Sequence, residues 1–213
     1  MLRLLYPHKC PLCRKVLPRK EMILCGQCEK DAPEFIHAKR SVPFIAHWTS
    51  LWYYMDKVRP SIHRFKFHGA RTYAQPYAKL LVSKLDAPYF RQFDILTWVP
   101  VSRRRKFHRG YDQAALIARA LGDEMGTPAQ QTLRKIRHTP PQSGIREPAK
   151  RRANVLGAFQ ALDPRQIAGK RILLIDDVIT TGATASECAR VLLTAGANEV
   201  IFAAVAAVNH NKK

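Results

Sequence analysis

The sequence predicts an α/β protein whose parallel sheet is covered on both faces, with a small metal-binding module at the amino terminus. Strand-length apolar segments alternate with segments of helical periodicity from residue 48 onward. The strand segments are apolar along both faces, as in parallel sheets buried between layers of helices. Four of the five cysteines lie within the first 28 residues as two C-x2-C pairs. These three observations define the fold class.

The amino-terminal module is marked by Cys10, Cys13, Cys25 and Cys28. Each C-x2-C pair presents two thiolates from one turn, and two pairs complete a tetrahedral shell around Zn²⁺. A segment of about 30 residues with few large apolar side chains needs metal to supply its folding energy. We expect structural zinc, because thiolates fill all four positions. Two disulfides are the alternative. His8 or His37 could replace a thiolate, but with four cysteines present we expect both histidines at the surface. The fifth cysteine, Cys188, is expected in the core.

The start of the chain does not resemble a secretory signal. Residues 1–5 are apolar, but Pro7, His8 and Lys9 follow at once, which leaves no apolar signal core. The longest apolar run, residues 200–208, falls short of the roughly 20 residues that a spanning helix needs. We expect a cytoplasmic protein without membrane insertion, whose thiols stay reduced.

The elements of the larger domain follow a linker marked by Pro33 and Pro43. A β-rich stretch over 48–55 predicts its first strand. The later periodicities predict strands over 94–101, 155–159, 171–176 and 199–207, and helices over 57–67, 73–85, 112–125 and 185–194. We therefore divide the chain into a zinc-ribbon-like module, residues 1–40, and an α/β domain, residues 41–213.

The net charge is +20, from 36 Lys and Arg against 16 Asp and Glu. A charge of this size favours polyanionic partners such as nucleic acid, phosphorylated ligands or anionic lipid. Residues 101–152 hold 13 basic and 4 acidic side chains, whereas residues 153–213 hold 6 and 5. This uneven spread excludes a uniform basic coat, and 46% hydrophobic residues exclude global disorder.

The most informative segment is LLIDDVITTGAT, residues 173–184. An apolar strand delivers two carboxylates at its carboxyl end, where open α/β sheets bind ligands. A loop of small and hydroxyl residues then enters a helix, whose amino end forms a cradle for phosphate. The carboxylates repel phosphate, but they accept hydrogen bonds from vicinal hydroxyls or help to place a divalent cation. The predicted ligand-binding residues are Asp176, Asp177, Thr180, Thr181, Gly182, Ala183 and Thr184.

Together these groups describe a ribose 5-phosphate. The alternative is a structural strand–turn–helix with an acidic cap. No G-x-x-x-x-G-K-[ST] loop is present, so nucleotide hydrolysis of the P-loop type is not supported.

The segment resembles the phosphoribosyl pyrophosphate (PRPP) motif of type I phosphoribosyltransferases, a strand followed by two acids and T-G-x-T. The resemblance implies that Asp176 and Asp177 hold the ribose hydroxyls, that Thr180 to Thr184 hold the 5′-phosphate, and that Mg²⁺ accompanies PRPP. Ala183 stands where members of the family often have glycine.

A narrower resemblance covers residues 10–208. The cysteine pairs ahead of such a domain, the phrase RHTPPQSG at 137–144 and the segments 99–113 and 151–159 are similar to the ComF family of competence and DNA-uptake proteins. Tyr111 and Asp112 stand where Phe and Asn are usual. The resemblance implies a role in natural transformation, with PRPP, single-stranded DNA and DNA-uptake or recombination proteins as partners.

Basic residues supply further candidates. Ser102, Arg103, Arg104 and Arg105 follow a predicted strand, where the phosphoribosyltransferase family places its pyrophosphate loop. Arginines can meet pyrophosphate with charge-assisted hydrogen bonds; a solvated face or a nucleic-acid stripe is the alternative.

Two basic segments remain open to more than one interpretation. Arg146 and the basic residues 150–152 resemble a mobile lid, with a plain surface loop as the alternative. The stretch FKFH at 65–68 interleaves aromatic and basic groups as stacking platforms do, although two such Phe side chains also suit a core.

Two functions follow. The first is a ComF-like competence protein that binds PRPP and single-stranded DNA. The alternative is an active phosphoribosyltransferase, which would transfer ribose 5-phosphate from PRPP to an acceptor and release pyrophosphate. The sequence names no catalytic nucleophile or acceptor pocket.

Overall fold

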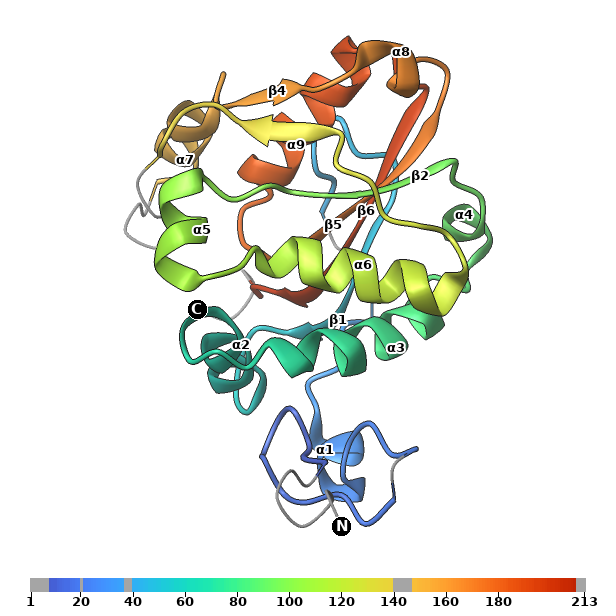
Figure 1. Ribbon diagram of the computed structural model, residues 1–213, viewed down its shortest axis with the longest axis vertical. Coiled ribbons are helices and arrows are strands. Elements are labelled where there is room, and N and C mark those ends of the chain that lie inside the picture. Colours follow the sequence, from blue (N-terminus) through green and yellow to red (C-terminus); the bar gives the residue numbers. More distant parts are fainter. Residues whose placement is uncertain (1–7, 20, 37–39, 140–146, 210–213) are drawn as a thin grey trace.

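The computed structural model describes residues 8–19, 21–36, 40–139 and 147–209. Its strands are β1 (Trp48–Tyr53), β2 (Ile95–Trp98), β3 (Leu133–Lys135), β4 (Phe159–Ala161), β5 (Arg171–Ile179) and β6 (Glu199–Ala207). Its helices are α1 (Gly26–Asp31), α2 (Val58–Phe67), α3 (Ala74–Lys84), α4 (Pro88–Arg91), α5 (Arg103–Arg109), α6 (Gln113–Met125), α7 (Pro148–Val155), α8 (Pro164–Ile167) and α9 (Ala183–Thr194), with a 3-10 turn at Arg71–Tyr73 (Figure 1). Across these residues no helix is both long and apolar enough to cross a membrane.

A four-stranded parallel sheet forms the centre, in the order β1-β6-β5-β2. The register pairs Trp98 of β2 with Ile175 of β5, and Asp176 with Ala204 of β6. The carboxyl ends of these strands therefore meet at one edge of the sheet, and β5 brings Asp176 to that edge. The predicted parallel α/β architecture is confirmed.

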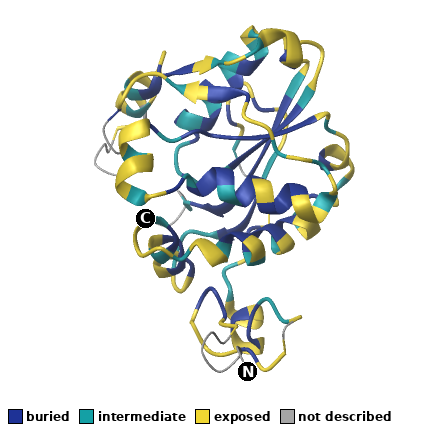
Figure 2. Cartoon of the chain, in the orientation of Figure 1, coloured by how far each residue is buried: buried dark blue, intermediate teal, exposed yellow. Residues whose placement is uncertain are grey.

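Helices cover both faces of this sheet (Figure 1). Leu173 and Ile175 of β5 belong to the core that α3 and α6 cover. Ile172 and Leu174, the alternate residues, belong to the core that includes α9. Successive strand side chains point to opposite faces, so the continuous apolar run of β5 serves both layers (Figure 2).

A small antiparallel sheet, β3 with β4, lies outside the main sheet. Here the expected strand over 155–159 is wrong, because α7 extends to Val155 and the strand begins only at Phe159. Gly157 separates the two with φ of 67°, a left-handed conformation that ends the helix. Short strands such as β3 leave too little periodicity to be predicted from sequence.

The other predicted elements are present with shifted ends. Residues 57–67, 73–85, 112–125 and 185–194 are helical over most of their lengths, and 48–55, 94–101, 171–176 and 199–207 contain strands. The strand predicted at 171–176 continues to Ile179. The basic segment 103–109, for which no helix was expected, forms α5.

The amino-terminal module packs on α2 (Figure 1). Its buried Leu12, Leu17 and Leu24 belong to the same core as Val58 and Phe65 of α2. The segment that leads from the cysteine cluster to β1 is also packed against the larger domain and is not a free linker. Phe35, 4% exposed, donates its N–H to the Leu51 carbonyl at 3.0 Å, and Val42 and Ile45 are buried. The two parts are thus joined by an apolar contact.

Gly122 tests the packing of α6 against the turn that follows it. A Cβ there would lie 2.6 Å from the Thr127 carbonyl oxygen and 3.1 Å from the Ala129 nitrogen. We expect Gly122→Ala to lower the free energy of unfolding by about 1–3 kcal/mol, because backbone atoms must move. The matched control is Gly26→Ala in α1, where a Cβ meets open space. Urea unfolding checks both, and equal stability of the two variants would contradict the expectation.

Candidate functional site

The four amino-terminal cysteines form one cluster. Their Sγ atoms all lie within 4.8 Å of one another, and Cys13 Sγ lies 3.5 Å from Cys25 Sγ. A tetrahedral zinc site with Zn–S bonds of about 2.3 Å has sulfur atoms roughly 3.8 Å apart, so this set fits the ion. All five cysteines are free thiols, which argues against the disulfide alternative.

The backbone of each pair holds its sulfurs in place. Arg14 N–H donates to the Cys10 carbonyl at 2.8 Å, which closes the first turn. Cys25 is the N-cap of α1, so the second pair lies at a helix start rather than in a simple turn. The Cys28 backbone N–H lowers the pKa of the Cys25 thiol to about 7. His8 Nε2 lies 3.2 Å from the Met22 carbonyl oxygen, outside the cluster, and His37 lies outside the described residues.

Asp176 and Asp177 stand near the carboxyl end of β5. Asp177 is only 7% exposed, and its N–H donates to Asp176 Oδ1 at 2.8 Å. Burial and the neighbouring Asp177 carboxylate raise the pKa of Asp176 well above its ordinary value. Adjacent buried carboxylates resist joint ionisation, so a group that donates hydrogen bonds or carries positive charge is favoured beside them.

Lys66 supplies such a charge. Its Nζ lies 2.8 Å from Asp177 Oδ1, and the two side chains are 21% and 10% exposed. Lys66 comes from the stretch FKFH, for which the sequence left a core and a stacking role open. The two Phe side chains of that stretch have different environments: Phe65 is buried in the core, whereas Phe67 is 51% exposed. The role of Lys66 could not be predicted, because nothing in the sequence relates it to a residue 111 positions away.

The loop after β5 turns sharply into α9. Gly182 is the N-cap with φ of 81°, a conformation that favours glycine, and a Cβ there would lie 3.0 Å from Val42 Cγ1. The Arg40 guanidinium donates to the Thr180 carbonyl, while Thr181 Oγ1 lies 3.5 Å from the Ala183 nitrogen. The turn is therefore supported from beneath by the segment that precedes β1. Thr184 lies one residue into α9.

A second loop reaches the same edge from β2. Val99 N–H donates to the Ile175 carbonyl at 2.9 Å, so residues 99–102 start beside the acid pair. Asp112 fixes this loop, because its carboxylate accepts from the Val101 N–H and from the Ala115 N–H, each at 3.1 Å. Ser102, buried, is the N-cap of α5. Ser102 therefore ends the loop that starts beside Ile175, the residue before the acid pair.

The three arginines after Ser102 diverge because they lie in the first turn of α5. Arg103 and Arg104 are exposed, whereas the Arg105 guanidinium turns inward and donates to the Thr139 carbonyl at 2.8 Å. The three arginine side chains therefore point in different directions and do not face one common ligand. His138 Nδ1 lies 3.2 Å from Ser102 Oγ.

Lys135 lies near Arg105 behind this loop. Its ammonium donates to Thr139 Oγ1 at 2.8 Å and lies 5.0 Å from the centre of the Phe159 ring. Burial, and then the charge of Arg105, lowers the pKa of Lys135 to about 8. An anion that enters the site would raise this pKa again, because a nearby negative charge favours the protonated ammonium. Sequence inspection missed it, because a lone lysine on a short strand carries no signal.

The remaining sequence-based expectations have different outcomes. Of the predicted basic lid, residues 150–152 lie in α7, while Arg146 lies outside the described residues, as do residues 140–144 of the phrase RHTPPQSG. Cys188 is buried as expected, which raises the pKa of its thiol. Asp112 caps α6, and Tyr111 donates its hydroxyl to the Phe65 carbonyl, so both departures from the usual residues have structural partners.

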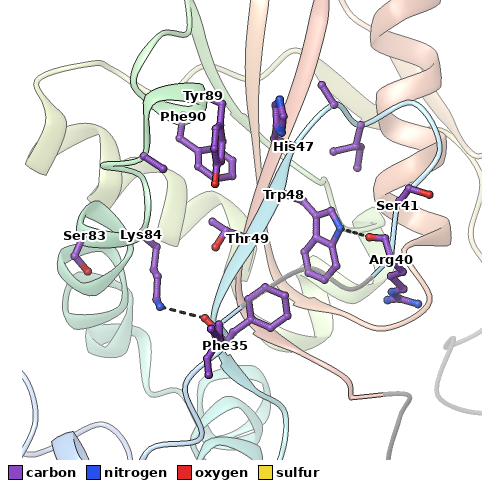
Figure 3. A pocket seen from close by; sticks show the side chains of 14 residues that line it. Phe35, Arg40, Ser41, His47, Trp48, Thr49, Ser83, Lys84, Tyr89 and Phe90 are labelled. Carbon is purple, nitrogen blue, oxygen red and sulfur yellow. Dashed lines mark hydrogen bonds between the residues drawn. The ribbon is translucent and has the colours of Figure 1, made fainter.

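A separate cavity of about 620 Å³ lies beside the edge strand β1 (Figure 3). Trp48 and Phe35 pack against each other in a tilted arrangement with ring centres 5.0 Å apart, and His47 stacks on Tyr89 at 4.6 Å. Arg40 also lines it. None of the predicted ligand-binding residues does, so this cavity is distinct from the acid pair and its loop.

Comparison with known proteins adds independent information. Residues 110–213 match the Phosphoribosyl transferase domain. The chain is 30% identical over 182 residues to Competence protein F of Haemophilus influenzae, covering 83% of this chain and 75% of that protein. It is 28% identical over 200 residues to DNA utilization protein YhgH of Salmonella typhimurium, covering 90% and 86%. It is 27% identical over 191 residues to Competence protein ComFC of Bacillus subtilis, covering 89% and 73%.

Solved structures similar to this chain include the glutamine PRPP amidotransferase of B. subtilis. The identity is 22% and the TM-score 0.44, over 66% of this chain and 30% of that chain. This chain thus spans less than a third of that structure.

The acid pair should cost stability at neutral pH. Because the pKa of Asp176 is raised in the native state above 3.8, the unfolded chain loses this proton first as pH rises, and stability falls with it. We expect Asp176→Asn to raise the free energy of unfolding at pH 7 by about 0.5–2 kcal/mol, with the gain vanishing near pH 3. Urea unfolding across pH measures this.

The matched control is Asp163→Asn, at the N-cap of α8, where the side chain accepts from Arg165 N–H at 3.0 Å. Asparagine caps equally well, so we expect a change below about 0.5 kcal/mol. An Asp176→Asn protein that is less stable than the wild type at pH 7 would contradict the expected stability cost of the ionised Asp176 carboxylate.

Proposed function

The chain belongs to the Competence protein F (ComF) family, and from this premise we propose that it acts in DNA uptake during natural transformation, binding PRPP at the end of β5 and single-stranded DNA on α5. Competence and DNA utilization are the functions in the names of its relatives. The observation that carries the PRPP assignment is the acid pair joined directly to the glycine turn at the start of α9.

The PRPP assignment rests on complementary chemistry. Asp176 and Asp177 offer acceptors that a ribose diol can satisfy, and hydroxyl donors relieve the repulsion between them. Gly182, at the N-cap of α9, has no side chain to cover the amide groups of the turn, which favour a phosphate. The proposed phosphate residues are Thr180, Thr181, Gly182, Ala183 and Thr184. The match to the Phosphoribosyl transferase domain over 110–213 includes both the acid pair and the glycine turn.

The pyrophosphate of PRPP would lie toward the second loop. Ser102 and the inward-facing Arg105 are on that side, with Lys135 behind them. Mg²⁺ bound to the pyrophosphate would neutralise part of its charge, and the Asp176 carboxylate would be suited to orient such an ion. Arg103 and Arg104 remain available to another partner.

We assign the four-cysteine cluster to structural zinc and residues 1–40 to its module, with residues 41–213 as the phosphoribosyltransferase-like domain. Thiolates fill all four ligand positions, so the ion would have no open site for a substrate. Few large side chains are available to the module, and metal binding would supply its folding energy.

The proposed DNA surface is α5, because it combines exposed charge with an exposed ring. Phe107 is 93% exposed, and Arg103, Arg104, Lys106 and His108 on the same helix are also exposed. Nearby, Arg109 covers the ring of Phe67 at 4.9 Å. Unpaired bases stack on aromatic rings, and backbone phosphates pair with such cations. A duplex hides its base faces, so a bare ring favours a single strand.

Transferase activity is the second candidate, favoured by the cations on the pyrophosphate side. An acceptor nucleophile would attack the anomeric carbon as pyrophosphate leaves, and the cations would stabilise the departing charge. Pyrophosphate release from PRPP, measured over a panel of purine, pyrimidine and amine acceptors, decides between binding and turnover.

Removal of one ligand-binding carboxylate tests the PRPP site. We expect Asp177→Asn to weaken PRPP binding by about 10- to 100-fold, because charge-assisted hydrogen bonds to the hydroxyls are lost. Calorimetric titration in Mg²⁺ buffer measures the affinity, and Asp163→Asn on α8 is the charge-matched control. Wild-type affinity in Asp177→Asn, or no PRPP binding by the wild type, would refute the assignment.

The DNA surface predicts two separable effects. Arg104→Ala should weaken binding to a thymidine oligonucleotide and lower the slope of log affinity against log salt by about 0.7, because one phosphate contact is lost. Phe107→Ala should weaken binding by about 1–3 kcal/mol with an unchanged slope, because it removes stacking rather than charge. Fluorescence anisotropy at several salt concentrations measures both.

The control is Arg165→Ala, an exposed arginine on α8, remote from α5 (Figure 1). Its affinity should stay within twofold of the wild type. If Arg165→Ala weakens binding as much as Arg104→Ala, the charge acts diffusely and α5 is not the site. If Phe107→Ala binds as tightly as the wild type, stacking on this ring is excluded.

A further inference from the structure

Helix α2 contacts both the cysteine cluster and the acid pair. At its middle, Ser61 Oγ donates to the Pro11 carbonyl at 2.5 Å. The Arg64 guanidinium donates to the Pro11 carbonyl at 2.9 Å and to the Leu12 carbonyl at 2.7 Å. Pro11 and Leu12 are the two residues between Cys10 and Cys13. The helix therefore binds the backbone of the first cysteine turn directly.

Two residues after Arg64, the same helix reaches the ligand site. Lys66 Nζ lies 2.8 Å from Asp177 Oδ1, with both side chains largely buried. Tyr111, next to Asp112 of the second loop, donates its hydroxyl to the Phe65 carbonyl. The last turn of α2 is thus held between the first cysteine turn and the edge of the sheet where the two loops meet.

The position of α2 depends in part on the module. A helix of ten residues is marginal by itself in water, so packing must hold it. Its buried Val58, Ile62 and Phe65 share a core with Leu12 and Leu17 of the module. Loss of metal would unfold the module, and α2 would then lose both this cover and the two carbonyl acceptors.

We propose that α2 couples metal binding to ligand binding: a metal ion in the four-cysteine cluster positions Lys66 against Asp177, and this ion pair prepares the acid pair for the ribose hydroxyls. The inference rests on the proposed PRPP site. A carboxylate has about four lone-pair positions, so Asp177 can accept from Lys66 and from a hydroxyl together. Lys66 is a positioning residue, because it orients Asp177 and offsets the charge beside it.

The coupling is tested by PRPP titration of wild type and Lys66→Met, each with zinc bound and after zinc removal and return to Mg²⁺ buffer. In the wild type, zinc removal should weaken PRPP binding on the order of 5- to 50-fold. Zinc-bound Lys66→Met should show a similar loss, and zinc removal should then change its affinity less than twofold. Lys66→Arg should recover part of the affinity, because it keeps the charge.

A second variant separates the contact from the metal. Ser61→Ala with Arg64→Met removes the bonds to Pro11 and Leu12, along with those to the Tyr77 and Tyr73 hydroxyls. It should weaken PRPP binding while zinc, measured by chelator competition, stays bound. The matched control is Arg59→Met, an exposed arginine on α2, which should bind PRPP within twofold of the wild type. Wild-type affinity in zinc-bound Lys66→Met, or equal zinc effects with and without Lys66, would overturn the proposal.

Amide hydrogen exchange keeps this test independent of the PRPP assignment. Zinc removal should raise exchange in α2 and in residues 177–179 in the wild type, and zinc-bound Lys66→Met should show raised exchange in 177–179 alone. If zinc-bound wild type fails to bind PRPP but shows this pattern, the proposed function fails and the coupling stands. If exchange in 177–179 is unchanged in both samples, the coupling fails whatever the ligand.

Discussion

The burial of two adjacent carboxylates near the end of β5, together with the repulsion between them, is the constraint around which the site is arranged. Asp176 and Asp177 are brought to the edge of a buried parallel strand, where water cannot fully solvate both charges. Lys66 offsets one charge from outside the sheet. A ligand that donates hydroxyl hydrogen bonds would offset the rest. We therefore expect the site to lower the stability of the protein when no ligand is bound.

The surrounding segments keep this arrangement in place. Val42 packs beneath Gly182, and Arg40 bonds to Thr180, so residues before β1 hold the glycine turn. Asp112 holds the loop from β2 at Val101. These supports come from sequence positions far from the acid pair, and each fixes backbone rather than side chain. The result is a site whose two loops are anchored separately and meet at one edge of the sheet.

The sequence predicted what depends on local pattern. The strand and turn over 173–184, the four-cysteine cluster and the helix after Asp112 each carry a residue pattern with one dominant physical interpretation. Contacts between distant segments carry no such pattern, which is why Lys66 and Arg40 were not foreseen. The strand expected at 155–159 was wrong because Val155, a β-favouring residue, is the last residue of α7, where its burial in the core that includes α9 overrides local propensity.

In the basic segment 103–109, the helix determines which charged side chains face solvent. The sequence RRRKFHR alone does not show which of its side chains face the protein. Once the segment forms a helix, some of these side chains turn toward the protein and the others toward solvent. Ser102, Arg105 and Arg109, at the three- and four-residue spacings that share a helix face, turn inward to His138, Thr139 and Gln113. Arg103, Arg104, Lys106, Phe107 and His108 turn to solvent. Helical geometry thus separates the cations that turn toward the loop after β2 from those that face solvent, so the proposed PRPP and DNA sites would use different side chains.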